Sequence, residues 1–420
     1  MAVATRATST KHLSLRALAL VRENPNFALL MLGRVTSNMG RSARVFARAW
    51  IVLELTGSPF LLGLVTSSLS WPMLVMPFVG GVLADRMDRR KLLIWTEGLL
   101  TILWLAVSVD IAFGWIRWWH LAVSGIGSGV IQSVGRPGHD AMVGSVVAKE
   151  DLPAAVAVDN IVDHWPRAIG LVLATFGVAL IGVRGIFWGT AILQGITVMA
   201  IVALKWNGFE SDVDMSELKK KSGKENLVEG IKAIGKEPVL IGLTLMAATA
   251  TLFAGSYGFL MPFFARDILG VGATGFGTMQ LAGNIGTSIG AAAVMFFIKP
   301  GARGKMLLFT TMAYAVLIIS FSRSTTFVLS LSLVFLMGMM STVTRTVMLL
   351  MMQMLAQNEF RGRVMSIRVF IQGLSWIGVL IMGAVAQFAG PQNTILIGAS
   401  IYAAITLVWF VTRPTIWRLK

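Results

Sequence analysis

Long apolar stretches separated by short polar turns repeat along most of the chain. Each stretch is about 20 residues long, which is the length that a helix needs to cross the hydrocarbon core of a bilayer. A transmembrane β-barrel would show short segments of alternating polarity instead. The pattern predicts an all-α membrane protein with twelve transmembrane helices, at residues 27–53, 60–84, 91–113, 118–145, 153–182, 184–205, 238–264, 272–298, 304–322, 325–355, 363–389 and 393–412.

The longest polar stretch, residues 206–237, lies between the sixth and the seventh predicted helix. It predicts a cytoplasmic linker between two six-helix bundles, at residues 27–205 and 238–412, with a polar segment at 1–26 and a tail at 413–420. The spacing from Arg136 to Arg345 equals that from Asp159 to Arg368, and Gly63 and Gly272 are separated by the same distance. These matches indicate two pseudo-symmetric halves, an arrangement in which transporters bind substrate between the halves near the membrane midplane.

The composition agrees with a membrane protein, because 55% of the residues are hydrophobic and 13% are charged. A soluble domain has about 25% charged residues. The chain has no cysteine and four scattered histidines, so we expect no disulfide, metal site or cofactor. Residues 1–26 have no apolar core followed by a cleavage site, so we expect no signal peptide.

The net charge of +16 is explained by basic residues that gather on one side of the predicted membrane topology. If residues 1–26 are cytoplasmic, 24 of the 36 Lys and Arg residues lie on that side, and four lie outside: Arg117, Arg184, Arg266 and Arg323. Lys and Arg are enriched in cytoplasmic loops. We therefore expect a multi-pass protein of the bacterial cytoplasmic (inner) membrane with both termini cytoplasmic, a monomer that contacts lipid and binds no nucleic acid.

The turn after the second predicted helix reads GGVLADRMDRRK over residues 80–91. It closely resembles the signature of the major facilitator superfamily, with Asp88 in place of a glycine. The resemblance implies that Asp85 faces the N-terminal end of the eleventh helix, whose dipole favours an anion. It also implies a cytoplasmic latch formed by the basic residues Arg86, Arg89 and Arg90.

Four segments, at residues 54–59, 136–137, 150–153 and 361–366, resemble one branch of this superfamily more closely. That branch contains the enterobactin exporter and macrolide efflux proteins, the transmembrane secretion effector type. The resemblance implies a secondary transporter, not an enzyme: an antiporter that exports a small amphipathic solute in exchange for protons by alternating access.

Two departures from this branch leave other functions open. Exporters often have a Gly-Pro pair where this chain has Gly170-Leu171, and relatives often have an acid where Arg41 stands. A lipid or lysolipid mover and an importer of an organic acid remain alternatives on the same fold. A non-transporting membrane sensor is a third alternative.

The first predicted helix carries four arginines, Arg34, Arg41, Arg44 and Arg48, at spacings that place them on one stripe. An arginine inside a bilayer costs a few kcal/mol, so the stripe requires a wet cavity or acidic partners. We interpret Arg41, Arg44 and Arg48, with the repeat-related Arg136 and Arg345, as candidates that bind an anionic group on the substrate. The alternative is that they pair with acids on neighbouring helices, which we favour for Arg34.

Acidic residues inside predicted helices are candidate proton carriers. Asp163 lies four residues from Asp159 and from Arg167 and shares a helix face with both, and His164 follows it. Asp163 carries the proton or neutralises an arginine; we expect Asp159 to form a cytoplasmic gate with Arg368. The remaining proton-coupling candidates are Glu97, His139 and Asp140.

The methionines between Met337 and Met354 form a dense group in the tenth predicted helix. No cysteine or histidine accompanies them, and their spacing is typical of core packing. We therefore expect them to pack in the protein interior and not to bind a metal ion.

Overall fold

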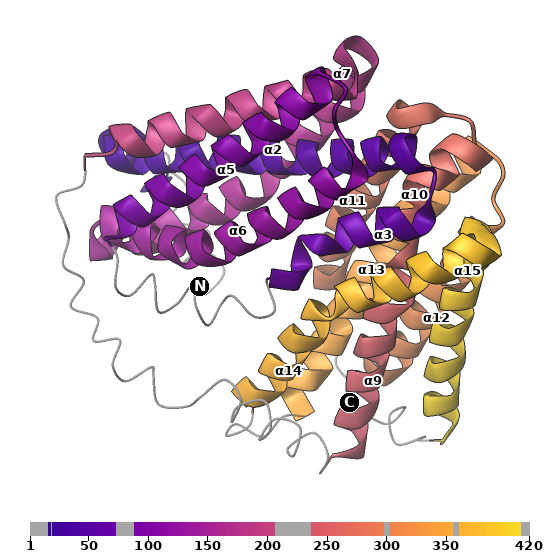
Figure 1. The fold of residues 1–420 in the computed structure, drawn as a ribbon. Helices are drawn as coiled ribbons and strands as arrows, with labels where there is room; N and C mark the ends of the chain where they lie inside the picture. Colours follow the sequence, from indigo (N-terminus) through magenta and orange to yellow (C-terminus); the bar gives the residue numbers. More distant parts are fainter. Residues whose placement is uncertain are drawn as a thin grey trace. The chain divides into compact units, whose positions relative to one another are not determined.

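The computed structural model describes residues 16–72 except 18, 88–205, 237–297, 303–355 and 361–412. The chain is helical in these ranges and has no strand there (Figure 1). Its longer helices are α2 (Pro25–Thr56), α3 (Pro59–Ser68), α5 (Arg89–Ala112), α6 (Trp118–Val146), α7 (Leu152–Ala203), α9 (Pro238–Leu252), α11 (Gly272–Phe297), α12 (Arg303–Ser322), α13 (Phe327–Leu355), α14 (Arg361–Gly373) and α15 (Ser375–Thr412).

Four short elements lie between these helices. A 3₁₀ turn, η1, precedes α7 at Lys149–Asp151. The segment predicted as one helix over residues 238–264 is divided by a second 3₁₀ turn, η3 (Ala254–Ser256), and continues as α10 (Tyr257–Phe263). It ends in a π-helical turn, η4 (Phe264–Ile268).

Six helical runs in the described ranges are long and apolar enough to cross a membrane. Two of them, of 55 and 43 residues, contain a break at Gly182 (φ 64°) and Gly390 (φ 79°). A positive φ is accessible to glycine at little cost, so each run is two helices joined at a glycine. Both glycines lie where the sequence predicts one helix to end before the next.

The contacts between helices divide the chain into two compact units. The first unit contains residues 1–51 and 68–213, and the second contains 52–67 and 214–420. Along the chain, the main division between the units falls between residues 213 and 214. Residues 52–67, however, pack with the second unit: a Cβ atom on Gly63 would lie 3.0 Å from the carbonyl oxygen of Val379.

Each unit has its own hydrophobic core. Phe27, Leu30 and Met142 are buried in the first. In the second, Met351 and Met352 of α13 pack in the buried core with Leu243, as expected from their spacing, whereas Met354 at the end of α13 is exposed.

Glycines bring the backbones of α11 and α13 into direct contact. A Cβ atom on Gly286 would lie 1.9 Å from the carbonyl oxygen of Phe335, and one on Gly338 would lie 2.2 Å from that of Gly283. In the first unit, a Cβ atom on Gly170 would lie 2.3 Å from the carbonyl oxygen of Met39. Small residues that allow such approach are typical of helix packing in membranes.

Candidate functional site

A polar pocket, which we call the first pocket, lies within the first unit among α2, α5, α6 and α7. Five arginines and two carboxylates line it together with a histidine. These residues are Arg34, Arg41, Arg44, Arg136, Arg167, Glu97, Asp163 and His139. The structure therefore brings together most of the charged residues that the sequence singles out in the first half of the chain.

Arg34 is the centre of an arginine–carboxylate network at this pocket. Its Nε lies 3.1 Å from Asp159, and its two Nη atoms lie 3.4 Å from Asp140 and 3.5 Å from Asp163. The Arg34 side chain is only 12% exposed. Arg34 is thus compensated by acids from α6 and α7, as we favour from the sequence.

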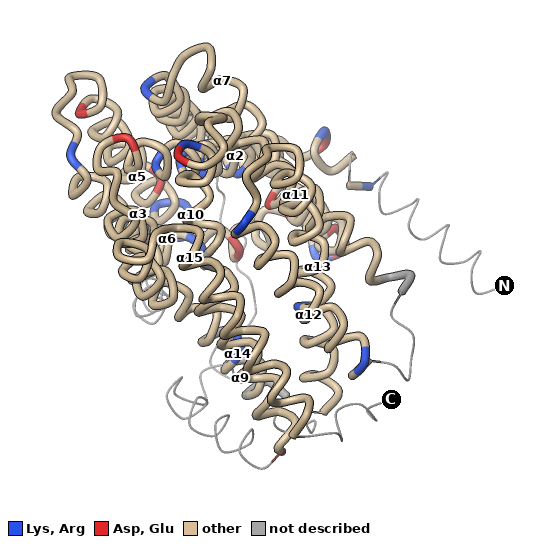
Figure 2. Tube along the Cα trace, turned by 90° about the vertical axis from the view of Figure 1, so that its right-hand side faces the viewer, with Lys and Arg blue, Asp and Glu red and all other residues tan. Residues whose placement is uncertain are grey.

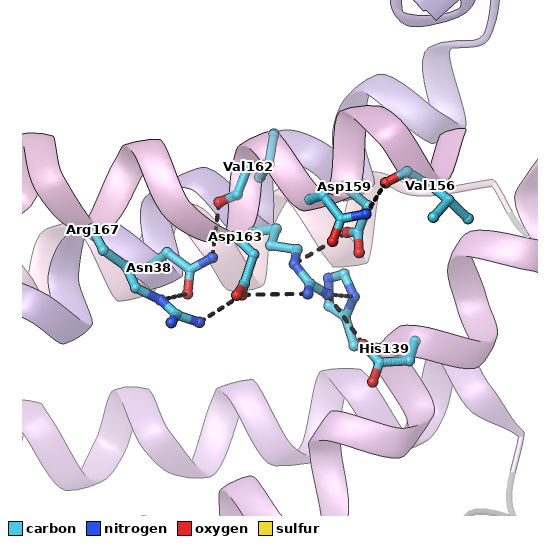
Figure 3. A network of polar contacts seen from close by, with 10 residues as sticks. Asn38, His139, Val156, Asp159, Val162, Asp163 and Arg167 are labelled. Atoms are coloured by element: carbon cyan, nitrogen blue, oxygen red, sulfur yellow. Dashed lines mark hydrogen bonds and ion pairs between the residues drawn. The ribbon is translucent and has the colours of Figure 1, made fainter. Parts of the chain in front are cut away.

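Asp163 is shared between two guanidinium groups. One of its oxygens accepts a hydrogen bond of 2.6 Å from Arg167, one turn along α7, and lies 3.5 Å from Arg34 on α2. Asn38 accepts a hydrogen bond from Arg167 and donates one to the carbonyl of Val162 (Figure 3). Asn38 thereby holds Arg167 against Asp163.

His139 joins the network through Arg34. An Nη atom of Arg34 lies 2.6 Å from Nδ1 of His139. Arginine is a donor only, so Nδ1 accepts this hydrogen bond and the ring is neutral with its proton on Nε2. A proton added to Nδ1 breaks this contact and places two cations side by side.

A second buried chain of polar groups links α2 to α5 through α7. Arg44 donates to the amide oxygen of Gln194 at 3.1 Å, and the amide nitrogen of Gln194 donates to Glu97. The guanidinium carbon of Arg44 also lies 4.8 Å from the ring centre of Trp104, a cation–π distance. Gln194 is fully buried and joins the cation to the carboxylate. Our reading of the sequence missed Gln194, although a lone amide inside an apolar helix is a usable signal.

Arg41 and Arg136 line the first pocket without a hydrogen bond or ion pair to any described residue. Arg41 is half-buried and Arg136 is exposed. Because their neighbours Arg34 and Arg167 already share the carboxylates, these two side chains give the pocket a surplus of positive charge.

Several predicted site residues lie away from the first pocket. Arg48 is buried and donates a hydrogen bond of 2.9 Å to Ser68. His164 is exposed beside the exposed Trp165, and the Asp140 side chain is 57% exposed. None of these side chains lines the pocket.

The predicted cytoplasmic latch is described only in part. Arg89 donates to Ser145 at 2.5 Å and Arg90 donates to the carbonyl of Val202 at 2.6 Å, so both hold the N-terminal end of α5 to its neighbours. Asp85 and Arg86 lie outside the described residues. Asp159 pairs with Arg34 in the first unit, and its predicted gate with Arg368 stays a prediction.

A second pocket lies within the second unit and contains Arg345 and Arg368. Tyrosines, hydroxyl side chains and an amide line it, chiefly Tyr314, Tyr402, Ser341, Thr344, Ser375 and Gln372. Its volume is about 390 Å³, against about 100 Å³ for the first pocket. No carboxylate lines it, which distinguishes it from the first pocket.

An exposed ion cluster ties the N-terminal segment to the turn before α7. Arg16 donates two hydrogen bonds, of 2.7 and 2.8 Å, to the Asp151 carboxylate and one of 3.0 Å to Glu23. The hydrogen bonds to Asp151, with its negative charge, raise the pKa of Arg16 above its usual value. Arg16 therefore stays a cation.

The family model of the Major Facilitator Superfamily matches residues 30–377. The chain is similar to the enterobactin exporter EntS of Shigella boydii serotype 4 (strain Sb227), with 23% identity over 83% of this chain and 82% of the relative. It is also similar to the multidrug efflux pump Tap of Mycolicibacterium fortuitum, with 24% identity over 88% of each chain.

Solved structures with the same fold are also transporters. The nucleoside transporter NupG has a TM-score of 0.69 at 14% identity, over 92% of this chain and 98% of its own. The peptide transporter POT, in complex with sulfate, has a TM-score of 0.66 at 12% identity, over 94% and 96%. Since the family model covers most of the sequence, the chain belongs to the major facilitator superfamily and is a membrane transporter, not an enzyme.

Proposed function

We propose that this transporter exports a small amphipathic organic anion from the cytoplasm in exchange for protons, by alternating access. Export is supported by the two relatives, whose names describe an exporter and an efflux pump. An anionic cargo is supported by the positive surplus of the first pocket, where Arg41 and Arg136 have no described partner. The names of these relatives, an enterobactin exporter and a multidrug efflux pump, also support an organic solute as the cargo.

The position of Asp163 carries the proposal of proton coupling. This carboxylate lies between Arg34 and Arg167 at the wall of the pocket. When Asp163 takes a proton, both guanidinium groups lose a partner, and the charge of the pocket changes by one unit. A titratable group in contact with the cargo pocket is the arrangement that links proton binding to cargo binding.

The proposal includes the topology. Twelve spans with both termini in the cytoplasm agree with the breaks at Gly182 and Gly390 and with the distribution of Lys and Arg. In this arrangement the protein is a monomer in the bacterial inner membrane.

The charge arrangement also favours a second candidate, the import of an organic acid together with protons. A proton on Asp163 removes a negative charge beside Arg34 and Arg167, so the pocket then attracts an anion more strongly. By linkage, a bound anion favours the protonated carboxyl equally. In this pocket, proton binding therefore strengthens anion binding and anion binding strengthens proton binding. Such positive cooperativity is the behaviour expected of a co-transporter.

Transport into inverted membrane vesicles distinguishes these candidates. The probes are labelled naphthalene-2-carboxylate, its neutral methanol analogue and its cationic methylamine analogue. Export by exchange predicts that the carboxylate accumulates when the vesicle lumen is acidic. Co-transport predicts accumulation when the bath is acidic. Accumulation of only the neutral or cationic probe would contradict an anionic cargo.

Two variants test the residues. Arg41→Ala should abolish carboxylate transport while the protein still folds and inserts, because Arg41 makes no hydrogen bond to a described residue. Asp163→Asn should remove the response to the pH gradient. The matched control is Asp110→Asn, because Asp110 pairs with His120 at 3.4 Å and does not line the pocket. Unchanged kinetics in Arg41→Ala would overturn the role of Arg41.

A further inference from the structure

Arg345 of α13 and Arg368 of α14 lie in a part of the chain that is nearly free of acids. Between residues 238 and 412 the sequence has two acids, Asp267 and Glu359. Asp267 is paired with Arg266 at 2.5 Å, and Glu359 lies outside the described residues. Figure 2 shows how sparsely charge is placed along the helices. Among the described residues of 238–412, the two pocket arginines therefore have no carboxylate partner.

The two arginines also interact with each other as like charges. Arg345 and Arg368 line the same pocket, so the two guanidinium groups bring like charges to it. Unpaired cations at membrane depth are costly and require a counter-charge or water. A bound anion would supply the counter-charge and reduce the repulsion between the two cations. The arrangement is therefore better suited to an occupied pocket than to an empty one.

The remaining walls of the second pocket combine hydroxyl groups with apolar surface. Tyr314, Tyr402 and Ser341 contribute hydroxyl groups to the lining. The rings of Tyr314 and Tyr402 meet edge to face with their centres 6.2 Å apart. Met348 adds apolar surface to the pocket lining. A volume of about 390 Å³ is in the range of small-molecule sites.

We propose that the second pocket binds the charged end of the cargo through Arg345 and Arg368, and that the cargo is a small carboxylate with an apolar body. Guanidinium groups bind planar oxyanions in a bidentate manner, and the partly buried Ala247 and Ala250 add apolar lining for the rest of the molecule. This inference rests on the proposed anionic cargo. It adds a binding site that lies inside the second unit.

Equilibrium binding to the purified full-length protein tests this site without reference to transport. The probe is naphthalene-2-carboxylate, measured in phosphatidylcholine nanodiscs by calorimetry against the methanol analogue. We expect Arg345→Gln and Arg368→Gln each to weaken binding of the carboxylate at least about tenfold, the loss expected for one charge-assisted hydrogen-bonding partner. Arg323→Gln, an exposed arginine of the same unit outside the pocket, should bind like the parent.

A second variant keeps both arginines. Gln372→Glu places a carboxylate in the pocket lining and should also abolish carboxylate binding, whereas Asn393→Asp adds the same charge at an exposed position of α15 and should not. If both arginine variants and Gln372→Glu bind like the parent while Arg41→Ala does not, the inference is overturned and the proposed function stands. If the arginine variants lose binding but no pH-driven transport is seen, the site stands and the proposed function fails.

Nanodiscs that contain phosphatidylglycerol distinguish a solute from a lipid headgroup. Competition by this anionic lipid that depends on Arg345 and Arg368, together with no binding of the carboxylate in phosphatidylcholine, would overturn the assignment to a solute. Carboxylate binding of equal strength in both lipids is the result that we expect.

Discussion

The two pockets hold arginines in opposite electrostatic settings. In the first unit, Arg34, Arg44 and Arg167 each have a described carboxylate or amide partner within 3.5 Å. In the second unit, Arg345 and Arg368 line a larger pocket that no acid lines. The difference shows that an arginine inside a membrane helix does not by itself indicate a binding site. An arginine indicates a binding site for an anion only where the protein itself does not supply the opposite charge.

The largest effect should come from removing a carboxylate that compensates the arginines of the first pocket. Asp163→Asn leaves Arg34 and Arg167 with one carboxylate fewer, and removing one partner of a largely buried ion pair costs about 3 kcal/mol. Arg345→Gln removes no described pair and relieves repulsion, so the free energy of unfolding should stay unchanged or rise by up to about 1 kcal/mol. Equilibrium unfolding in mixed micelles, followed by tryptophan fluorescence, measures both values.

Asp110→Asn serves as the control for that experiment, because Asp110 pairs near the end of α5 and outside the first pocket. Equal destabilisation by Asp163→Asn and Arg345→Gln would show that the second unit compensates Arg345 after all, and the contrast between the pockets would be lost.

A smaller effect is the interaction energy between two charged side chains of the same pocket, whose sign should differ between the two pockets. A double-mutant cycle on Arg44→Gln and Glu97→Gln should give a favourable interaction of about 1 kcal/mol, transmitted by Gln194. The same cycle on Arg345→Gln and Arg368→Gln should give an unfavourable interaction, because two like charges are removed. Interaction energies of the same sign in the two cycles would contradict the comparison.

The smallest effect should come from an ion cluster that is open to water. Arg16→Gln removes the exposed contacts to Asp151 and Glu23, and exposed pairs contribute little because water and salt screen them. We expect no measurable change in melting temperature at physiological ionic strength. A clear drop that persists in high salt would show that the N-terminal segment is held by more than these charges.

Periodicity was sufficient to predict a helical chain and the shared face of three arginines. The three- and seven-residue spacings predict one face for Arg34, Arg41 and Arg44, and the structure places all three at one pocket. The two glycine breaks also lie where the apolar pattern predicts separate helices. These features depend on residues within one helix, so a single sequence contains them.

Partners from distant segments could not be predicted in the same way. The contacts of Arg34 with His139 and of Gln194 with Glu97 join helices that are far apart in sequence, and periodicity contains no information on which helices meet. Arg48 lies on the predicted stripe, yet it contacts Ser68 and does not line the pocket. The placement of residues 52–67 depends on the contact of Gly63 with α15.

The glycine contact between α11 and α13 affects how natural variation in this chain should be read. At Gly286 even a methyl group would overlap the backbone of α13, whereas Gly189 of α7 has open space around it and should accept alanine. In a saturation-mutagenesis library, Gly286 should therefore be depleted of every substitution under any selection that needs the protein to be made, whichever solute is supplied. Pocket residues such as Arg345 should lose fitness only when the cargo matters to the cell. Comparing survival with and without the cargo therefore distinguishes residues needed for folding from residues needed for cargo binding.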